Sequence, residues 1–168
     1  MKDLRIVFGL IAALICQTTL LLRFDAVNFD LILIVVVFSA LSRGHLVGLW
    51  SGAVSGFVQD VMSGGIIGVS GLAKSLAGVL VGLAGSQFLI STIWHRVAIL
   101  MAASIFHVLC FMGVYLLIDQ VSVSTFIPLA MEQAFLNGFI GAIILLVAAG
   151  FPRFGKKFRI LTMFRSRN

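Results

Sequence analysis

The sequence has little charge. Only 11% of its 168 residues are Asp, Glu, Lys or Arg, whereas 61% are hydrophobic; a soluble domain carries roughly 25% charged residues. With 2 prolines and 15 phenylalanines, the composition also excludes a disordered, solvated chain. Because a spanning helix needs about 20 apolar residues, roughly six such helices fit in the chain. The composition therefore predicts an all-α, polytopic membrane protein built as a six-helix bundle.

Catalytic and metal-binding motifs are also missing from the sequence. It contains no HExxH or GxSxG, and Cys16 and Cys110 are far from any CxxC or Cys/His cluster. The segment from Gly68 to Ser75 comes close to the phosphate-binding pattern GxxxxGK[ST], but Ala73 replaces its second glycine and no strand precedes it. We therefore expect no enzyme activity, no metal, no cofactor and no nucleotide site.

Apolar runs divide the chain into one transmembrane domain, residues 1–151, and a tail, residues 152–168. The predicted spans are residues 6–22, 27–41, 45–62, 70–90, 97–118 and 126–151. The tail contains no acidic residue, and its basic residues are Arg153, Lys156, Lys157, Arg159, Arg165 and Arg167. Its charge of +6 equals the net charge of the whole chain.

The distribution of basic residues predicts the orientation of the domain. If both termini are cytoplasmic, the inside segments hold Lys2, Arg5, Arg43 and Arg96 together with the six basic residues of the tail. The outside loops then hold a single basic residue, Arg23, and the acidic residues Asp25, Asp30 and Asp119. This bias favours both termini inside and an even number of spans.

The basic tail interleaves large apolar side chains with its lysines and arginines. In a membrane protein this composition indicates a segment that lies on anionic lipid, rather than one that binds nucleic acid. Contact with a cytoplasmic protein is the competing interpretation, and a solvated flank explains only the first few residues.

Glycines recur at an interval of four along the third predicted span, and the fourth span repeats the pattern. Residues four apart share one helical face, and glycine lets helix backbones approach closely in lipid. The glycines concerned are Gly44, Gly48, Gly52, Gly56, Gly78 and Gly82. Two interpretations remain open: internal packing of the bundle, or a groove for a partner's transmembrane helix.

Apart from Asp30, which is counted above with an outside loop, three charged residues fall within the predicted spans: Asp60, Lys74 and Glu132. The predicted topology places all three at similar depth in the outer half of the membrane. A buried charge in hydrocarbon normally pairs or faces a polar cavity. Because Asp60 and Lys74 flank one short connection, we expect them to pair and to fix the register of two helices. A polar binding cavity or ion route, and snorkelling to the interface, are the alternatives.

The stretch from residue 40 to residue 72 resembles the rod shape-determining protein MreD family. The residues that carry the resemblance are Ala40, Leu41, Gly44, Gly48, Gly52, Gly56, Phe57, Asp60, Ser63, Gly64, Gly68 and Leu72. One departure is Asn28-Phe29-Asp30, where we would expect a proline ahead of the second helix.

The resemblance implies a non-enzymatic scaffold in the bacterial inner membrane that belongs to the cell-wall elongation machinery. Its implied partners are the bitopic protein MreC and, beyond it, MreB, RodA and a class B penicillin-binding transpeptidase. It also implies a six-helix fold related to the substrate-binding subunits of energy-coupling-factor transporters. That kinship supplies the alternative function, a small-molecule (vitamin-type) binding subunit of a membrane transporter.

Overall fold

The computed structural model describes residues 2–21, 29–87, 92–118 and 126–150. These residues form six α-helices and no strand, which confirms the all-α prediction. The helices are α1 (Lys2–Leu21), α2 (Leu31–Arg43), α3 (His45–Ser63), α4 (Val69–Gln87), α5 (Ile93–Leu117) and α6 (Phe126–Gly150).

Length and hydropathy together distinguish the helices within the described residues, and α3, which has 19 residues, is not among the candidate membrane spans. Three segments are long and apolar enough to cross a membrane: α4, α5 and Ile127–Val147 of α6. With 13 residues, α2 is about 20 Å long at roughly 1.5 Å per residue, shorter than a hydrocarbon core of about 30 Å. The apolar part of α1, Ile6–Thr19, is similarly short. Six helices are present, but six full crossings remain a prediction.

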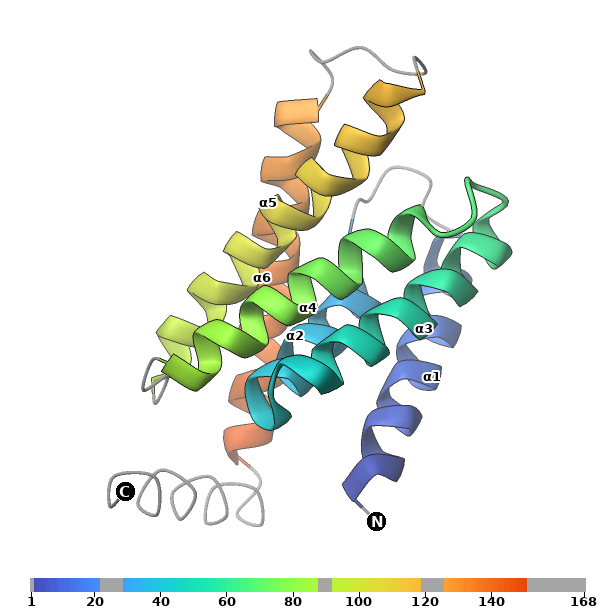
Figure 1. Ribbon diagram of the computed structural model, residues 1–168. Coiled ribbons are helices and arrows are strands. Elements are labelled where there is room, and N and C mark those ends of the chain that lie inside the picture. Colours follow the sequence, from blue (N-terminus) through green and yellow to red (C-terminus); the bar gives the residue numbers. More distant parts are fainter. Residues whose placement is uncertain (1, 22–28, 88–91, 119–125, 151–168) are drawn as a thin grey trace.

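The helices are arranged as two antiparallel pairs joined by α2 (Figure 1). The most extensive contact is between α3 and α4, and α5 packs along α6. Helix α2 contacts both α3 and α4, and α1 packs against α2. The start of α1 and the end of α6 lie at the same end of the bundle, as an even number of crossings requires. Which side of the membrane this end faces stays a prediction.

The core of the bundle surrounds α2, which is apolar on nearly every side. Its side chains Leu33, Val37 and Ala40 are buried with Ala77 of α4 and Leu100 of α5. A second cluster of buried residues joins the opposite side of α2 to α1. A short helix with neighbours all round explains why the sequence there shows an unbroken Val/Ile/Leu run.

Several helix starts differ from the predicted span starts, by four residues in α1, α2 and α5. Helix α2 begins at Leu31 instead of residue 27, because Asp30 has an extended backbone and acts as its N-cap. Helix α5 begins at Ile93, so that His95 and Arg96 belong to its first turn and not to a loop.

Candidate functional site

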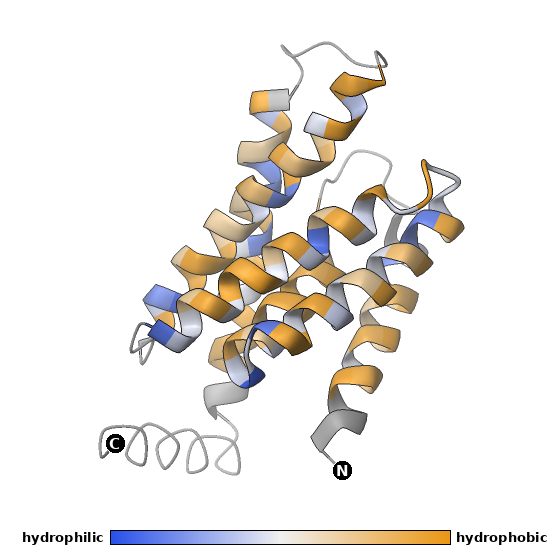
Figure 2. Cartoon of the chain, viewed as in Figure 1, coloured by the Kyte–Doolittle hydropathy of each residue, from blue (hydrophilic) through white to orange (hydrophobic). Residues whose placement is uncertain are grey.

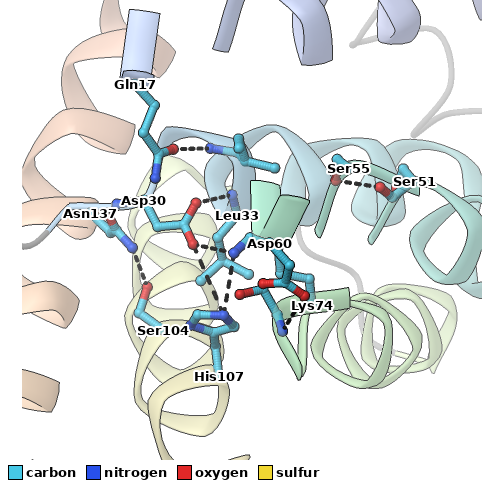
Figure 3. Close-up of polar contacts among 12 residues, drawn as sticks. Gln17, Asp30, Leu33, Ser51, Ser55, Asp60, Lys74, Ser104, His107 and Asn137 are labelled. Atoms are coloured by element: carbon cyan, nitrogen blue, oxygen red, sulfur yellow. Dashed lines mark hydrogen bonds and ion pairs between the residues drawn. The ribbon is translucent and has the colours of Figure 1, made fainter. Parts of the chain in front are cut away.

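A buried ion pair joins the start of α2 to α4 (Figure 3). The ammonium Nζ of Lys74 lies 2.5 Å from the carboxylate Oδ2 of Asp30. The Lys74 side chain is 1% exposed and the Asp30 side chain 5%. Removing two charges from water costs several kcal/mol each, and such groups are tolerated only when they pair and make further hydrogen bonds.

The backbone at the start of α2 receives side chains from two other helices. The other oxygen of Asp30, Oδ1, accepts from the N–H of Leu33 at 2.9 Å. The N–H of Asp30 donates to Oδ1 of Asn137 in α6 at 2.9 Å. The N–H of Ile32 donates to Oε1 of Gln17 in α1 at 3.3 Å. Backbone N–H groups at the start of α2 would have no acceptor in an interior without water. Here they donate to the side chains of Gln17, Asn137 and Asp30.

His107 of α5 lies on the other side of the Lys74 ammonium. Its Nε2 is 3.4 Å from Nζ of Lys74 and 4.0 Å from Oδ2 of Asp30. Because a charged ammonium only donates, this contact assigns the acceptor role to Nε2 and the ring proton to Nδ1. That Nδ1 is buried and has no hydrogen-bond partner among the described residues.

Asn137 extends the network to the α5–α6 contact. Its Nδ2 donates to Oγ of Ser104 at 3.0 Å, and that hydroxyl donates to the carbonyl of Leu100 at 2.9 Å. Both Asn137 and Ser104 are fully buried. We call the connected side chains the Asp30 cluster: Gln17, Asp30, Lys74, Ser104, His107 and Asn137. This cluster links α1, α2, α4, α5 and α6.

The expected pairing of Lys74 with Asp60 is wrong, because Lys74 pairs with Asp30. Asp60 is buried near the end of α3, where its Oδ2 accepts from the N–H groups of Gly68 at 2.8 Å and Ser70 at 3.1 Å. A carboxylate at the start of a helix is favoured by the unpaired N–H groups and by the helix dipole. Asp60 therefore caps α4.

Glu132 differs from the other predicted charged residues in its exposure and in its helix. It is exposed on α6, whereas Lys74 is fully buried on α4, and within the described residues α6 makes no extensive contact with α3 or α4. The structure therefore does not gather Asp60, Lys74 and Glu132 into one polar cluster. Asp30, assigned by the sequence to an outside loop, lies in the connection before α2 as its N-cap, but only 4% of the residue is exposed.

Sequence reasoning missed most of the Asp30 cluster, although two signals were present. Asp30 directly precedes an apolar run, which is a typical N-cap position. Asn137 is an amide within a long apolar helix, and such a side chain needs a partner in a membrane. Neither pattern identifies the residues that Asp30 and Asn137 contact.

The glycines of α3 and α4 meet each other. A Cβ added at Gly52 would lie 2.6 Å from the backbone carbonyl of Lys74, and one at Gly56 would lie 2.5 Å from Cα of Gly71. Gly48 and Gly78 face each other in the same way, and Gly82 meets the backbone of His45. Contact within the chain therefore covers this face. Gly44 differs, because it forms the turn between α2 and α3 with a φ of 95°.

The predicted lipid or partner contacts of the tail lie outside the described residues. They are Arg153, Lys156, Lys157, Arg159, Arg165 and Arg167. Within the described ranges, no group of three His, Cys, Asp or Glu side chains is placed to hold a metal ion.

Comparison with known proteins gives one family. The model of the family described as rod shape-determining protein MreD matches residues 4–154 of the 168 residues. Neither the curated proteins nor the solved structures gave a match. The expected likeness to energy-coupling-factor subunits therefore stays a prediction.

Proposed function

The chain belongs to the MreD family of rod shape-determining proteins, and we propose that it acts as a non-enzymatic membrane scaffold that binds the bitopic protein MreC. Membership of the family carries a role in rod-shape determination. The scaffold mechanism and its partner go beyond that role.

The buried polar groups contact one another inside the protein, which supports a scaffold. Asp30 and Lys74 neutralise each other, and Asn137 is hydrogen-bonded on both its oxygen and its nitrogen. These groups hold five helices in fixed relation, and a preformed bundle of this kind presents constant surfaces to a partner. This is the single observation that carries the scaffold proposal.

The surfaces that remain for a partner's helix are those with large apolar side chains. The glycine face is covered by the contact between α3 and α4, so the proposed partner contact lies elsewhere. Exposed residues of this kind occur on α1, α3 and α6, and they include Phe8, Ile11, Trp50, Phe57, Met131, Phe135 and Phe139. A single transmembrane helix of MreC would be held there by van der Waals packing.

The remaining parts of the proposal concern the cell-wall elongation machinery. We place the chain in the bacterial inner membrane with both termini cytoplasmic. Its basic tail then contacts anionic lipid or the MreB filament, and RodA and a class B penicillin-binding transpeptidase are further partners of the assembly.

Affinity purification of the full chain in mild detergent tests the proposal. We expect MreC to co-purify with the full chain and equally with a variant that lacks residues 152–168. The truncated variant should lose cytoplasmic or lipid contacts only. Loss of MreC on truncation would contradict the assignment of MreC binding to the transmembrane domain and of lipid or cytoplasmic contact to the tail. Absence of MreC from both samples would contradict the scaffold proposal.

The small-molecule alternative lacks its structural basis. It depended on a polar pocket formed by Asp60, Lys74 and Glu132 near the outer face, and these residues do not come together. A small molecule retained through purification and seen by native mass spectrometry would restore it.

A further inference from the structure

A cavity of about 230 Å³ opens at one end of the bundle, where α2 ends, α3 begins and α4 ends. Its lining residues are Ala40, Leu41, Ser42, Arg43, Gly44, Gly82, Gly85 and Ser86. Three of these are glycines, so backbone forms much of the wall. A water molecule occupies about 30 Å³ of liquid, and the cavity is several times larger, which is enough for a phosphate group with its ester oxygens.

The length of α4 gives the depth of this cavity in a membrane. At roughly 1.5 Å per residue its 19 residues extend about 28 Å, which matches a hydrocarbon core of about 30 Å. If α4 crosses along the membrane normal, its final residues, including Gly85 and Ser86, reach the headgroup layer. In that orientation the cavity lies at the level of lipid phosphates on either side of the membrane.

The side chains of the cavity suit an anionic group that carries hydroxyls. Arg43 is the one charged residue in its described lining, and no acidic residue lines it. A guanidinium has several N–H donors in a planar fork, so that it can hold a phosphate while it keeps another contact. Figure 2 shows hydrophilic residues gathered at this end of α3, α4 and α5.

The two serines of the lining, Ser42 and Ser86, favour a ligand that also has hydrogen-bond donors. Oγ of Ser42 donates to the carbonyl of Phe38 at 2.6 Å, and Oγ of Ser86 donates to the carbonyl of Leu83 at 2.7 Å. Their protons are used in these bonds, but a hydroxyl oxygen has two lone pairs, so each serine can accept a hydrogen bond from a ligand besides the contacts it already makes. They match hydroxyl donors on a ligand, and not a second phosphate oxygen.

We propose that this cavity binds the headgroup of a glycerol-bearing anionic phospholipid. The phosphate pairs with Arg43, the headgroup hydroxyls donate to Ser42 and Ser86, and the apolar side of Leu41 contacts the start of the acyl chains. The site is independent of the proposed scaffold function and of the basic tail.

Lipid retention by the full chain tests the site. The purified protein is exchanged into mixed micelles that contain equal amounts of phosphatidylglycerol, phosphatidylethanolamine and phosphatidylcholine, and the retained lipid is counted by native mass spectrometry. We expect phosphatidylglycerol to be enriched in the wild-type protein. Arg43→Gln should lower that enrichment roughly tenfold, as expected for the loss of one charge-assisted contact, and Arg43→Lys should lower it less.

Two controls keep the outcome decisive. Arg96→Gln alters a basic residue of the first turn of α5 that does not line the cavity, and this variant should retain the lipid. If Arg96→Gln loses as much lipid as Arg43→Gln, any basic residue at this end of the bundle attracts anionic lipid, and the proposal fails.

The second control is inorganic phosphate, which is added alone as a competitor and should not displace the lipid. Displacement would show a general phosphate site and overturn the lipid assignment. Equal enrichment in the wild-type and Arg43→Gln proteins would overturn the site itself.

Discussion

The α3–α4 contact and the Asp30 cluster join helices of the same bundle by opposite means. Between α3 and α4 the side chains are reduced to glycine, so that the two backbones touch. In the Asp30 cluster, polar side chains from five helices extend into the interior and pair there. The first contact gains van der Waals energy at little desolvation cost. The second has a large desolvation cost, which the ion pair and the hydrogen bonds of the cluster offset.

The two regions therefore tolerate damage differently. A glycine face fails when a side chain is added, whereas a polar cluster fails when a side chain is removed and its partner is left without a counter-charge. Lys74 belongs to both regions, since its backbone contacts Gly52 and its ammonium contacts Asp30.

Lys74→Met should have the largest effect. It leaves the Asp30 carboxylate buried without its cation, which should lower the free energy of unfolding by about 3–5 kcal/mol. Unfolding in detergent micelles, or the folded yield, measures this loss. Leu72→Met, at an exposed position of the same helix, is the matched control and should change the free energy little. Wild-type stability of Lys74→Met would show that the pair contributes nothing.

Gly52→Ala should follow in size. The added Cβ would lie 2.6 Å from the carbonyl of Lys74, and overpacking of this kind costs about 1–3 kcal/mol. Gly113→Ala is the control, because a Cβ at that position of α5 would have no described atom within 4 Å apart from the neighbouring backbone of its own helix. Thermal unfolding in detergent micelles should show a lower midpoint for Gly52→Ala only. Equal midpoints would mean that α3 and α4 are not in backbone contact.

Asn137→Ala should lower stability by about 2 kcal/mol, because it leaves the N–H of Asp30 without its acceptor in the interior. Amide hydrogen exchange should show faster exchange at the start of α2. If protection there is unchanged, α6 does not hold the N-terminus of α2.

Asp60→Ala should have the smallest effect, about 1 kcal/mol, because it removes a helix cap and no counter-charge. Faster amide exchange should be confined to Gly68 and Ser70. A loss as large as that of Lys74→Met would argue that Asp60 also belongs to the buried ion pair.

The same comparison explains how much of the molecule the sequence predicts. Glycines at an interval of four are a local pattern, and a short connection brings their two helices together, so both the pattern and the helix ranges of α3 and α4 are predictable. The hydrogen bond between Asp30 and Asn137 joins residues 107 positions apart. No periodicity in the sequence encodes such a pair.

The error in the predicted partner of Lys74 has the same origin. Asp60 is near Lys74 in sequence, but the unpaired N–H groups at the start of α4 compete for its carboxylate and bind it. Lys74 therefore pairs with a different carboxylate, that of Asp30 at the start of α2. The boundaries of α2 are also set by tertiary contact, because its cap residue is fixed by Lys74 and Asn137.

A double-mutant cycle on Asp30 and Lys74 tests most directly that a buried ion pair organises the bundle. The free energy of unfolding in micelles is measured for Asp30→Asn, Lys74→Met and the double variant. We expect the double variant to be less damaged than the sum of the two single variants, by about 1–3 kcal/mol. Strict additivity would contradict a direct interaction between the two side chains and, with it, the central role of the Asp30 cluster.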